Sequence, residues 1–400
     1  MPRPSSPTSS AAAPLHGVRV LDLTRLLPGP LATRHLADLG AEIIKIEDTG
    51  AGDYAREMGP PPPGLRDADS RFFRALNRGK RALRLDLKHP LGKAVLRRLA
   101  ESADVLVESF RPGVMDRLGL GYEALKAVNP RLVYCAITGY GQDGPWRDLA
   151  GHDLNYLAVS GVLERTASTG AVQPAIPSLQ IGDLLGGALP AALSIVAALY
   201  GARQSGQGRM LDVAMAEVVL THHMTPLLAE AGAAAPRGGE MLTGGLPWYG
   251  VYATQDGRHL AVGALEAKFW AAFCATVERP EWAGQQHLDG TERDALRAAV
   301  ADLIASRPLA HWAERFATVD ACVTPVLTPE EALLLPQFQA RGLAGDELRS
   351  GAAASPFVMD GVRLTAGGEP PAPGQDSRAI LLDAGFAMDE VDGLLAQGIL

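Results

Sequence analysis

The chain has 400 residues, 47% of them hydrophobic, and a formal net charge of −8 at pH 7. This length and apolar content suffice for two domains that each bury a hydrophobic core. The negative charge argues against general binding to nucleic acid. The three cysteines, Cys135, Cys274 and Cys322, lie far apart. We therefore expect no disulfide framework and no metal site, and we expect a cytoplasmic protein.

Residues 1–15 are rich in Ser, Pro and Ala but lack the apolar core of a signal peptide, and we interpret them as a disordered leader. The longest apolar run, residues 186–202, contains Pro190 and is shorter than the ~20 residues that a bilayer crossing needs. We therefore expect a buried helix at this place and no membrane partner.

The first half of the chain alternates between strand and helix patterns. Four short apolar segments are predicted strands: residues 18–23, 41–47, 105–108 and 132–138. Apolar residues at helical spacing separate them: residues 31–39, 91–102 and 122–128. A long helix is predicted over residues 183–204. This alternation is typical of the α/β class, with a parallel sheet and helices on both faces.

A smaller α+β domain is predicted after a linker rich in Ala, Gly and Pro over residues 231–245. Strand patterns at residues 248–254 and 258–264 flank Asp256-Gly257, a pair that favours a tight hairpin turn. Helical patterns follow: residues 268–277, 291–305 and 309–318. The predicted division is a large domain over residues 16–230, a small domain over 231–325, and a return segment and tail over 326–400 that packs on the large domain.

Residues 139–144 match the pattern G-x-G-x-x-G and follow a predicted strand, as a dinucleotide-binding fingerprint would. Pro145 and Trp146 stand where the helix of that fingerprint should begin. We therefore favour a glycine-rich turn, in which Gly139 and Gly141 let the backbone approach a neighbouring group or a ligand.

His152 and Asp183 are the candidate acid–base residues. Each is expected where a loop meets a helix, and a histidine and a carboxylate that converge there can move a proton next to a carbonyl group. Backbone N–H groups near Asp183 would then hold the enolate oxygen. The simpler alternatives are a loop position for His152, an N-cap for Asp183 and a first-turn helix acid for Glu266.

Basic residues are concentrated in one short stretch: Arg78, Lys80, Arg81, Arg84 and Lys88. Such a cluster is either an anion-binding site or a solvated basic face of the protein. Spacing alone does not decide between these two interpretations.

Motifs along nearly the whole chain resemble, in order and spacing, the family III CoA-transferase superfamily. The agreement covers residues 18–47, Asn77-Arg78-Gly79-Lys80-Arg81, and residues 104–121, 129–144, 150–163 and 182–187. Within that superfamily, residues 150–156, 241–249 and 263–269 look most like those of α-methylacyl-CoA racemases. Agreement spread over so many segments is more specific than any single motif.

The resemblance implies a large Rossmann-like domain built from both ends of the chain, a small domain from its middle, and an interlocked homodimer. The active site would lie between the large domain of one subunit and the small domain of the other. The acid–base pair of the racemases falls on His152 and Asp183, and the glutamate that supports the histidine falls on Glu266. In the CoA transferases, the position of Asp183 is the nucleophile.

The resemblance also implies that CoA binds as part of the substrate, with no other cofactor and no metal. The residues expected to bind it are Arg78, Lys80, Arg81, Lys88, Arg111, Gly139 and Gly141. Two positions depart from the family pattern. Asp48 stands where many relatives place an arginine near the nucleotide, and Thr243 stands where the racemases carry an aspartate.

The function implied by the resemblance is epimerisation of a 2-methylacyl-CoA thioester by 1,1-proton transfer. The first alternative is CoA transfer between carboxylic acids, in which Asp183 attacks the thioester and forms an enzyme-bound intermediate. The second is a homologue that binds acyl-CoA without catalysis. The expected partners are the acyl-CoA thioester and a second copy of the chain, and neither nucleic acid nor a membrane.

Overall fold

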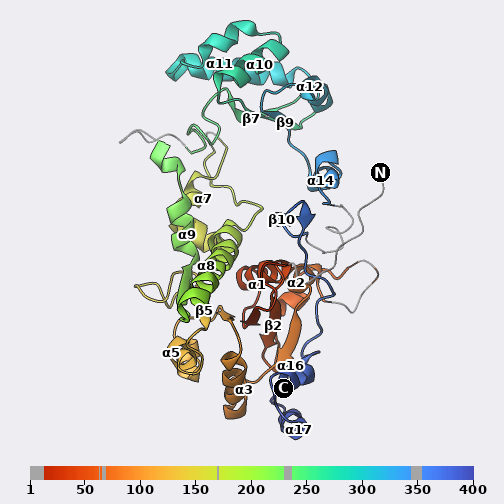
Figure 1. The fold of residues 1–400 in the computed structure, drawn as a ribbon. Helices are drawn as coiled ribbons and strands as arrows, with labels where there is room; N and C mark the ends of the chain where they lie inside the picture. Colours follow the sequence, from red (N-terminus) through yellow and green to blue (C-terminus); the bar gives the residue numbers. More distant parts are fainter. Residues whose placement is uncertain (1–12, 63, 65–68, 169–170, 229–236, 344–353) are drawn as a thin grey trace. The chain divides into compact units, whose positions relative to one another are not determined.

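The computed structural model describes residues 13–62, 64, 69–168, 171–228, 237–343 and 354–400 (Figure 1). The expected leader lies almost wholly outside these residues. The structure divides into two compact units. The first unit comprises Met1–Val159, Leu179–Leu220 and Pro336–Leu400, and the second comprises Ser160–Ser178 and Thr221–Leu335.

A six-stranded sheet with the order β3-β2-β1-β4-β5-β6 forms the centre of the first unit. Its strands are β1 (Arg19–Asp22), β2 (Glu42–Glu47), β3 (Arg81–Arg84), β4 (Val105–Glu108), β5 (Val133–Thr138) and β6 (Met210–Ala214). Every pairing within it is parallel. This order is that of a Rossmann-like sheet, in which the direction of strand addition reverses between β1 and β4. The predicted α/β class with a parallel sheet is confirmed.

Both faces of this sheet are buried because successive strand residues point to opposite sides. On one face Val20 belongs to the core beneath α1 (Pro28–Asp38) and α8 (Leu189–Ser205). On the other face Leu21 belongs to the core beneath a second group of helices. That group is α3 (Pro90–Glu101), α4 (Val114–Leu118), α5 (Tyr122–Lys126), α16 (Ser377–Asp383) and α17 (Met388–Ala396). The end of the chain therefore returns to the first unit.

Shorter elements complete the first unit. They are η2 (Tyr54–Glu57), α2 (Arg71–Asn77), α6 (Asp153–Val159), η3 (Gly182–Ala188), the start of α9 (Met215–His222), α14 (Pro336–Ala340), β10 (Val358–Met359) and β11 (Val362–Arg363). Strands β3 and β6 were not predicted as strands. The sequence of β3 has only Ala82 and Leu83 between two arginines, so its alternation is too short to separate it from a polar loop.

The second unit contains the three-stranded antiparallel sheet β7-β8-β9. Its elements are α7 (Val162–Arg165), η4 (Thr225–Leu228), β7 (Tyr249–Ala253), β8 (His259–Gly263), α10 (Ala267–Thr276), η5 (Pro280–Gln285), α11 (Gly290–Ala305), α12 (Leu309–Phe316), β9 (Val323–Pro325) and α13 (Pro329–Leu333). Gly257 has a φ of 72° between β7 and β8, which pair as the predicted hairpin. The stacked rings of Trp270, Phe273 and Phe316 lie in the hydrophobic core of the second unit. The small α+β unit is confirmed.

The second unit includes three segments that our sequence-based division assigned elsewhere: residues 160–178, 221–230 and 326–335. Arg237 holds the first of them, because its guanidinium donates to the Glu164 carboxylate at 2.6 Å and to the Val172 carbonyl at 2.6 Å. Arg165 also pairs with Glu240 at 3.0 Å. Contacts this distant in sequence cannot be deduced from a linker composition.

The long apolar helix is buried on one face only. Leu193 is 73% exposed and Tyr200 is 68% exposed, whereas Ile195 on the opposite side is fully buried. Among the residues that the structure describes, Gly182–Ser205 is the one stretch whose length and composition would allow a membrane crossing. A helix that packs one face on a sheet meets the same criterion, so this finding is weak evidence for a membrane span.

Lys80 lies within the core and not on a basic surface. Its ammonium group is 3.0 Å from the Asp22 carboxylate, 2.8 Å from the Thr33 hydroxyl, 2.9 Å from the Pro30 carbonyl and 3.0 Å from the Asn77 amide oxygen. Burial lowers the pKa of Lys80 to about 8, although the charge of Asp22 opposes this shift. Four acceptors occupy the three N–H donors of this side chain, so it has none left for a phosphate.

We expect Lys80→Met to lower the free energy of unfolding at pH 7 by about 3–5 kcal/mol, because Asp22 would remain buried without this partner. Urea unfolding followed by far-ultraviolet circular dichroism measures the change. Lys88→Met makes the same chemical change at an exposed lysine, and we expect it to stay within about 0.5 kcal/mol of the parent. Equal losses in the two variants would contradict the structural role of Lys80.

Candidate functional site

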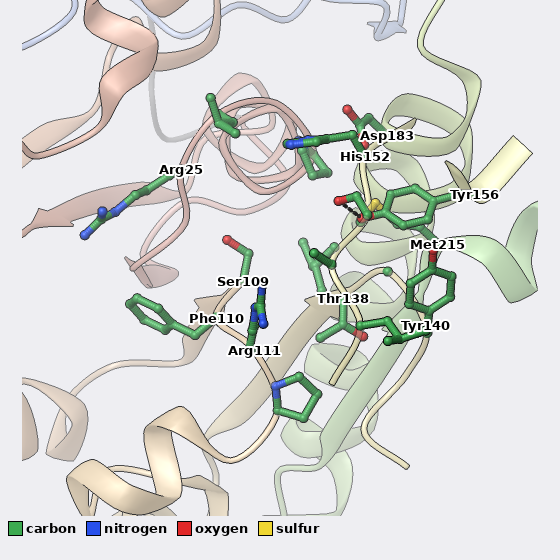
Figure 2. Close-up of a pocket in the computed structure, with 18 of the residues that line it drawn as sticks. Arg25, Ser109, Phe110, Arg111, Thr138, Tyr140, His152, Tyr156, Asp183 and Met215 are labelled. Atoms are coloured by element: carbon green, nitrogen blue, oxygen red, sulfur yellow. Dashed lines mark hydrogen bonds between the residues drawn. The ribbon is translucent and has the colours of Figure 1, made fainter. Parts of the chain in front are cut away.

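A cavity of about 410 Å³ opens at the carboxyl ends of β1, β4 and β5 (Figure 2). It is lined by Arg25 after β1, by residues 109–112 after β4, and by residues 138–140 after β5. The reversal of strand order between β1 and β4 lies at the same edge. In open parallel sheets, ligands bind outside the carboxyl ends of the strands at this reversal point.

His152 and Asp183 line the same side of this cavity, as Figure 2 shows. His152 immediately precedes α6, its backbone N–H donates to the Asn155 side chain at 3.0 Å, and its ring is exposed. Asp183 lies in the first turn of η3, one position after Gly182. The structure therefore brings together the two residues that the sequence singled out for acid–base chemistry.

The helical turn that carries Asp183 is wider than an α-helical turn. Gly182–Ala188 is π-helical, and the Leu189 N–H donates to the Leu184 carbonyl five residues earlier. Pro190 explains the wide turn, because proline has no N–H and its ring clashes with the carbonyl four residues before it. That carbonyl belongs to Gly186. π-Helical turns are frequent at functional sites.

Two glycines allow the wide turn to pack closely against its neighbours. A Cβ atom on Gly186 would lie 2.9 Å from the Met215 carbonyl oxygen, and one on Gly187 would lie 2.9 Å from Cβ of Pro28. Pro28 and Met215 also line the cavity. Close packing on both sides thus holds the second half of η3 against the cavity-lining residues Pro28 and Met215.

The carboxyl group of Asp183 is surrounded by groups that change its pKa in opposite directions. Burial, the largest cause, and the charge of Asp153 both raise the pKa, the charge of His152 lowers it, and the net result is a pKa of about 6. The Asp153 carboxylate accepts the N–H of Gly182 at 2.6 Å and the N–H of Asp183 at 3.1 Å. We expected backbone N–H groups near Asp183 to hold an enolate oxygen, and these two of them are occupied by Asp153.

The glycine-rich segment 139–144 forms a turn, with Gly141 at a φ of 91°, and no helix follows it. A Cβ atom on Gly139 would lie 2.6 Å from the ring of Tyr156, so the glycine permits this close approach. The Tyr156 hydroxyl donates to the Gly151 carbonyl at 2.6 Å. Tyr140 packs edge-on against Tyr156 with ring centroids 5.5 Å apart. Gly139 lines the cavity through this turn.

Three arginines line the cavity: Arg25, Arg111 and Arg147. Arg25 pairs with Asp48, which stands at the position where the family pattern has an arginine. Arg111 donates to the Asp148 carbonyl at 3.5 Å. Sequence reasoning found Arg111 but missed Arg25 and Arg147. The position of Arg25 directly after the first predicted strand was the available signal.

A second cavity, of about 660 Å³, adjoins the first. The two cavities share Leu23, Arg25 and Phe110, and the second is also lined by Asp48 and Lys88. A single extended ligand could therefore occupy both. Together they follow the carboxyl ends of β1, β2, β3 and β4.

The structure does not bring the whole predicted basic cluster to these cavities. Arg78 donates to the Gly368 carbonyl at 3.2 Å, and Arg81 pairs with Glu42 at 2.6 Å and with Asp383 at 2.9 Å. Neither arginine lines either cavity. Gly141 lies in the turn beside the first cavity without lining it. Of the predicted CoA-binding residues, Lys88, Arg111 and Gly139 line the two cavities.

Glu266 belongs to the second unit, where it is the exposed N-cap residue of α10. As the N-cap, Glu266 precedes the first turn of α10. The simpler alternative from the sequence, an acid within the first turn, is therefore off by one position.

A Rossmann-like sheet with a histidine and a carboxyl group in an arginine-lined cavity defines an α/β protein with a candidate ligand-binding site. The chain matches the model of CoA-transferase family III over residues 15–377, and it belongs to that family. The family predicted from the sequence motifs is thus confirmed.

Relatives with two kinds of activity match the chain. It is 37% identical over 385 residues to the α-methylacyl-CoA racemase of Homo sapiens, covering 94% of this chain and 95% of that protein. It is 34% identical over 337 residues to the acetyl-CoA:oxalate CoA-transferase of Acetobacter aceti, covering 82% and 85%. The solved structure of a CaiB/BaiF family protein from Brucella suis has a TM-score of 0.78 at 26% identity, covering 93% of this chain and 99% of that one.

We expect Asp183→Asn to raise the free energy of unfolding at pH 8 by about 1–3 kcal/mol. The folded state raises the pKa of this carboxyl group from 3.8 to about 6, so it disfavours the ionised form. The gain should be full above pH 6 and should vanish below about pH 3.8, where the group is protonated in both states. Thermal unfolding at a series of pH values measures it.

Asp143→Asn is the matched control for this measurement, because Asp143 is an exposed carboxylate on the loop after β5. We expect its effect on stability to be small, as for most substitutions at exposed positions. An Asp183→Asn variant with the same stability as the parent at pH 8 would contradict the claim that the folded state disfavours the ionised form of Asp183.

Proposed function

We propose that this protein epimerises 2-methylacyl-CoA thioesters by 1,1-proton transfer, with His152 and Asp183 as the acid–base pair. The observation that carries the proposal is the convergence of these two residues in one cavity at the reversal point of the sheet. The similarity to racemases over 94% of the chain supports the choice of substrate. CoA enters as part of the substrate. The free cysteines favour a cytoplasmic location.

The proposed reaction uses one member of the pair to remove the Cα proton of the thioester and the other to return a proton on the opposite face. General acid–base catalysis is most effective when the pKa of the group lies near the working pH. Burial raises the pKa of Asp183 to about 6, so this carboxyl group can both accept and donate a proton near neutrality. The neutral form of His152 can accept a proton, and its protonated form can donate one.

The two adjoining cavities support the binding of an extended anionic substrate. We assign the acyl thioester to the 410 Å³ cavity beside Asp183 and the nucleotide of CoA to the 660 Å³ cavity. Lys88 in the second cavity is the proposed partner of the phosphate groups, and Arg111 and Arg147 are further cations that line the first cavity. Asp48 neutralises Arg25, which leaves these other cations as the main attraction for the ligand.

CoA transfer is the second candidate function, because Asp183 is at the nucleophile position of the transferases and transferases are among the relatives. Its carboxylate would attack the thioester carbonyl and expel the CoA thiolate, giving a mixed anhydride. The thiolate would then attack the anhydride at Asp183, forming an enzyme thioester and releasing the acid. A homologue that binds acyl-CoA without either reaction is the remaining alternative.

We expect His152→Ala to reduce exchange of the Cα proton by at least ~10²-fold, because it removes one of the two proton-transfer groups. The measurement is incorporation of deuterium into (2R)- and (2S)-methylacyl-CoA in D₂O, followed by mass spectrometry. Binding of CoA by the variant, measured by calorimetry, is the control for folding. Unchanged exchange would contradict the proposed pair.

The same incubation with several free carboxylic acids tests the transferase alternative. Formation of new thioesters without Cα exchange would show that the protein is a CoA transferase and not a racemase. Hydroxylamine added during turnover should then modify Asp183, because it attacks the activated carboxyl group. Neither exchange nor transfer, with CoA still bound, would support the non-catalytic homologue.

We propose further that the protein is a homodimer in which Glu266 of one subunit orients His152 of the other. Support comes from the separation of these residues into different compact units of the chain. Glu266 is exposed at a helix start, so its carboxylate is available to a partner. A carboxylate that accepts the second imidazole N–H fixes the tautomer and orientation of the ring.

We expect activity to return when inactive Asp183→Ala and Glu266→Ala chains are refolded together. A heterodimer would combine the intact Glu266 of the first chain with the intact Asp183 of the second in one site. With random pairing, about one quarter of the parent activity per chain is expected. Native mass spectrometry verifies the heterodimers. Heterodimers without activity would place the whole site within one subunit.

A further inference from the structure

A second carboxylate, Asp153, lies beside Asp183 and is not one of the proposed acid–base groups. Its Oδ1 atom accepts the backbone N–H of Gly182 at 2.6 Å and that of Asp183 at 3.1 Å. Both donors belong to the first turn of η3, whereas Asp153 is the first residue of α6. One oxygen atom thus joins the start of α6 to the start of η3, through hydrogen bonds to residues 29 and 30 positions later in the sequence.

This contact fixes the orientation of the turn that carries Asp183. Hydrogen bonds from backbone N–H groups to an ionised carboxylate are among the stronger ones in proteins. Gly182 makes room for the contact, because a Cβ atom there would lie 3.0 Å from the Asp153 oxygen. The neighbouring residue His152 lies on the same loop. Asp153 therefore couples the position of Asp183 to the position of His152.

Asp153 also affects the charge of Asp183. Two carboxylates close together cannot both ionise without repulsion, and this favours the protonated form of one of them. The charge of Asp153 accordingly raises the pKa of the Asp183 carboxyl group. The effect adds to that of burial, and the charge of His152 opposes it.

Few other titratable groups act on the Asp183 carboxyl group. On α6 and the loop before it they are His152, Asp153 and Tyr156. Helices α1 and α8 and strand β6 also pack against η3. Their ionisable side chains are Arg34, His35 and Asp38 on α1, Tyr200 and Arg203 on α8, and Asp212 on β6. Arg34 pairs with Asp38, and Asp212 accepts the Gln142 N–H, so these act elsewhere.

We propose that Asp153 is a positioning residue for the reaction, which holds the turn of Asp183 through two backbone hydrogen bonds and places a second negative charge beside that carboxyl group. This inference rests on the proposed role of Asp183. It assigns two separable contributions to one side chain, a geometric one and an electrostatic one.

Two substitutions separate these contributions. Asp153→Asn keeps a side-chain oxygen that can accept both N–H groups but removes the charge, whereas Asp153→Ala removes both. We expect Asp153→Asn to keep kcat within about threefold, and to move the acidic limb of the kcat/KM profile to lower pH. We expect Asp153→Ala to lower kcat by about 10–100-fold with KM changed less than about threefold.

Asp143→Asn is the control for the loss of a charge, since it removes an exposed carboxylate from the loop that precedes α6. Its pH profile should match that of the parent. Either of two results would overturn the proposal: an Asp153→Asn profile that coincides with the parent, or equal kcat values for Asp153→Ala and Asp153→Asn. The acidic limb is read from whichever reaction the protein catalyses, exchange or transfer.

A measurement without turnover separates this inference from the proposed function. Protein labelled with ¹³C at aspartate carboxyl groups gives one resonance that is absent from Asp183→Asn, and this resonance belongs to Asp183. Its titration midpoint should fall in Asp153→Asn, even in a protein that shows neither exchange nor transfer. An unchanged midpoint would overturn the electrostatic contribution of Asp153, whatever the reaction.

Discussion

The reversal of strand order between β1 and β4 is the constraint on which the site depends. Chain segments leave the carboxyl ends of these two neighbouring strands toward opposite halves of the sheet, so the space between them is left to loops. The cavity lies at this place, and Arg25, Ser109 and Thr138 reach it from three strand ends. The starts of α6 and η3 at the same edge of the sheet then place His152 and Asp183 beside the cavity.

Periodicity predicted the sheet where strands are long apolar runs, and it failed where they are not. Strand β5 is buried at every position and was found, whereas β3 is flanked by Arg81 and Arg84. The same polar appearance led to an incorrect role for Lys80, whose four buried acceptors come from β1, α1 and α2. A basic residue in sequence does not reveal whether its ammonium group points to water or to a buried aspartate.

The candidate site was easier to predict than its surroundings. His152 and Asp183 were found because a family pattern and an expected helix start coincide at each of them. The π-helical turn and the contact of Asp153 with Gly182 have no such signature, because they depend on the packing of segments about thirty residues apart. Relatives named as a racemase and as a CoA-transferase match this chain over most of its length, so one fold is shared by proteins with two chemistries.

The wide turn before Pro190 has a consequence for sequence evolution in this segment. A π-helical turn is equivalent to an α-helix with one inserted residue, so deleting a residue between Leu184 and Leu189 would restore the ordinary helix. Each α-helical residue turns the chain by about 100°, and the carboxyl group of Asp183 would rotate by that amount away from the cavity. A deletion in this segment is therefore expected to remove the carboxyl group of Asp183 from the cavity even when every residue of the site is kept.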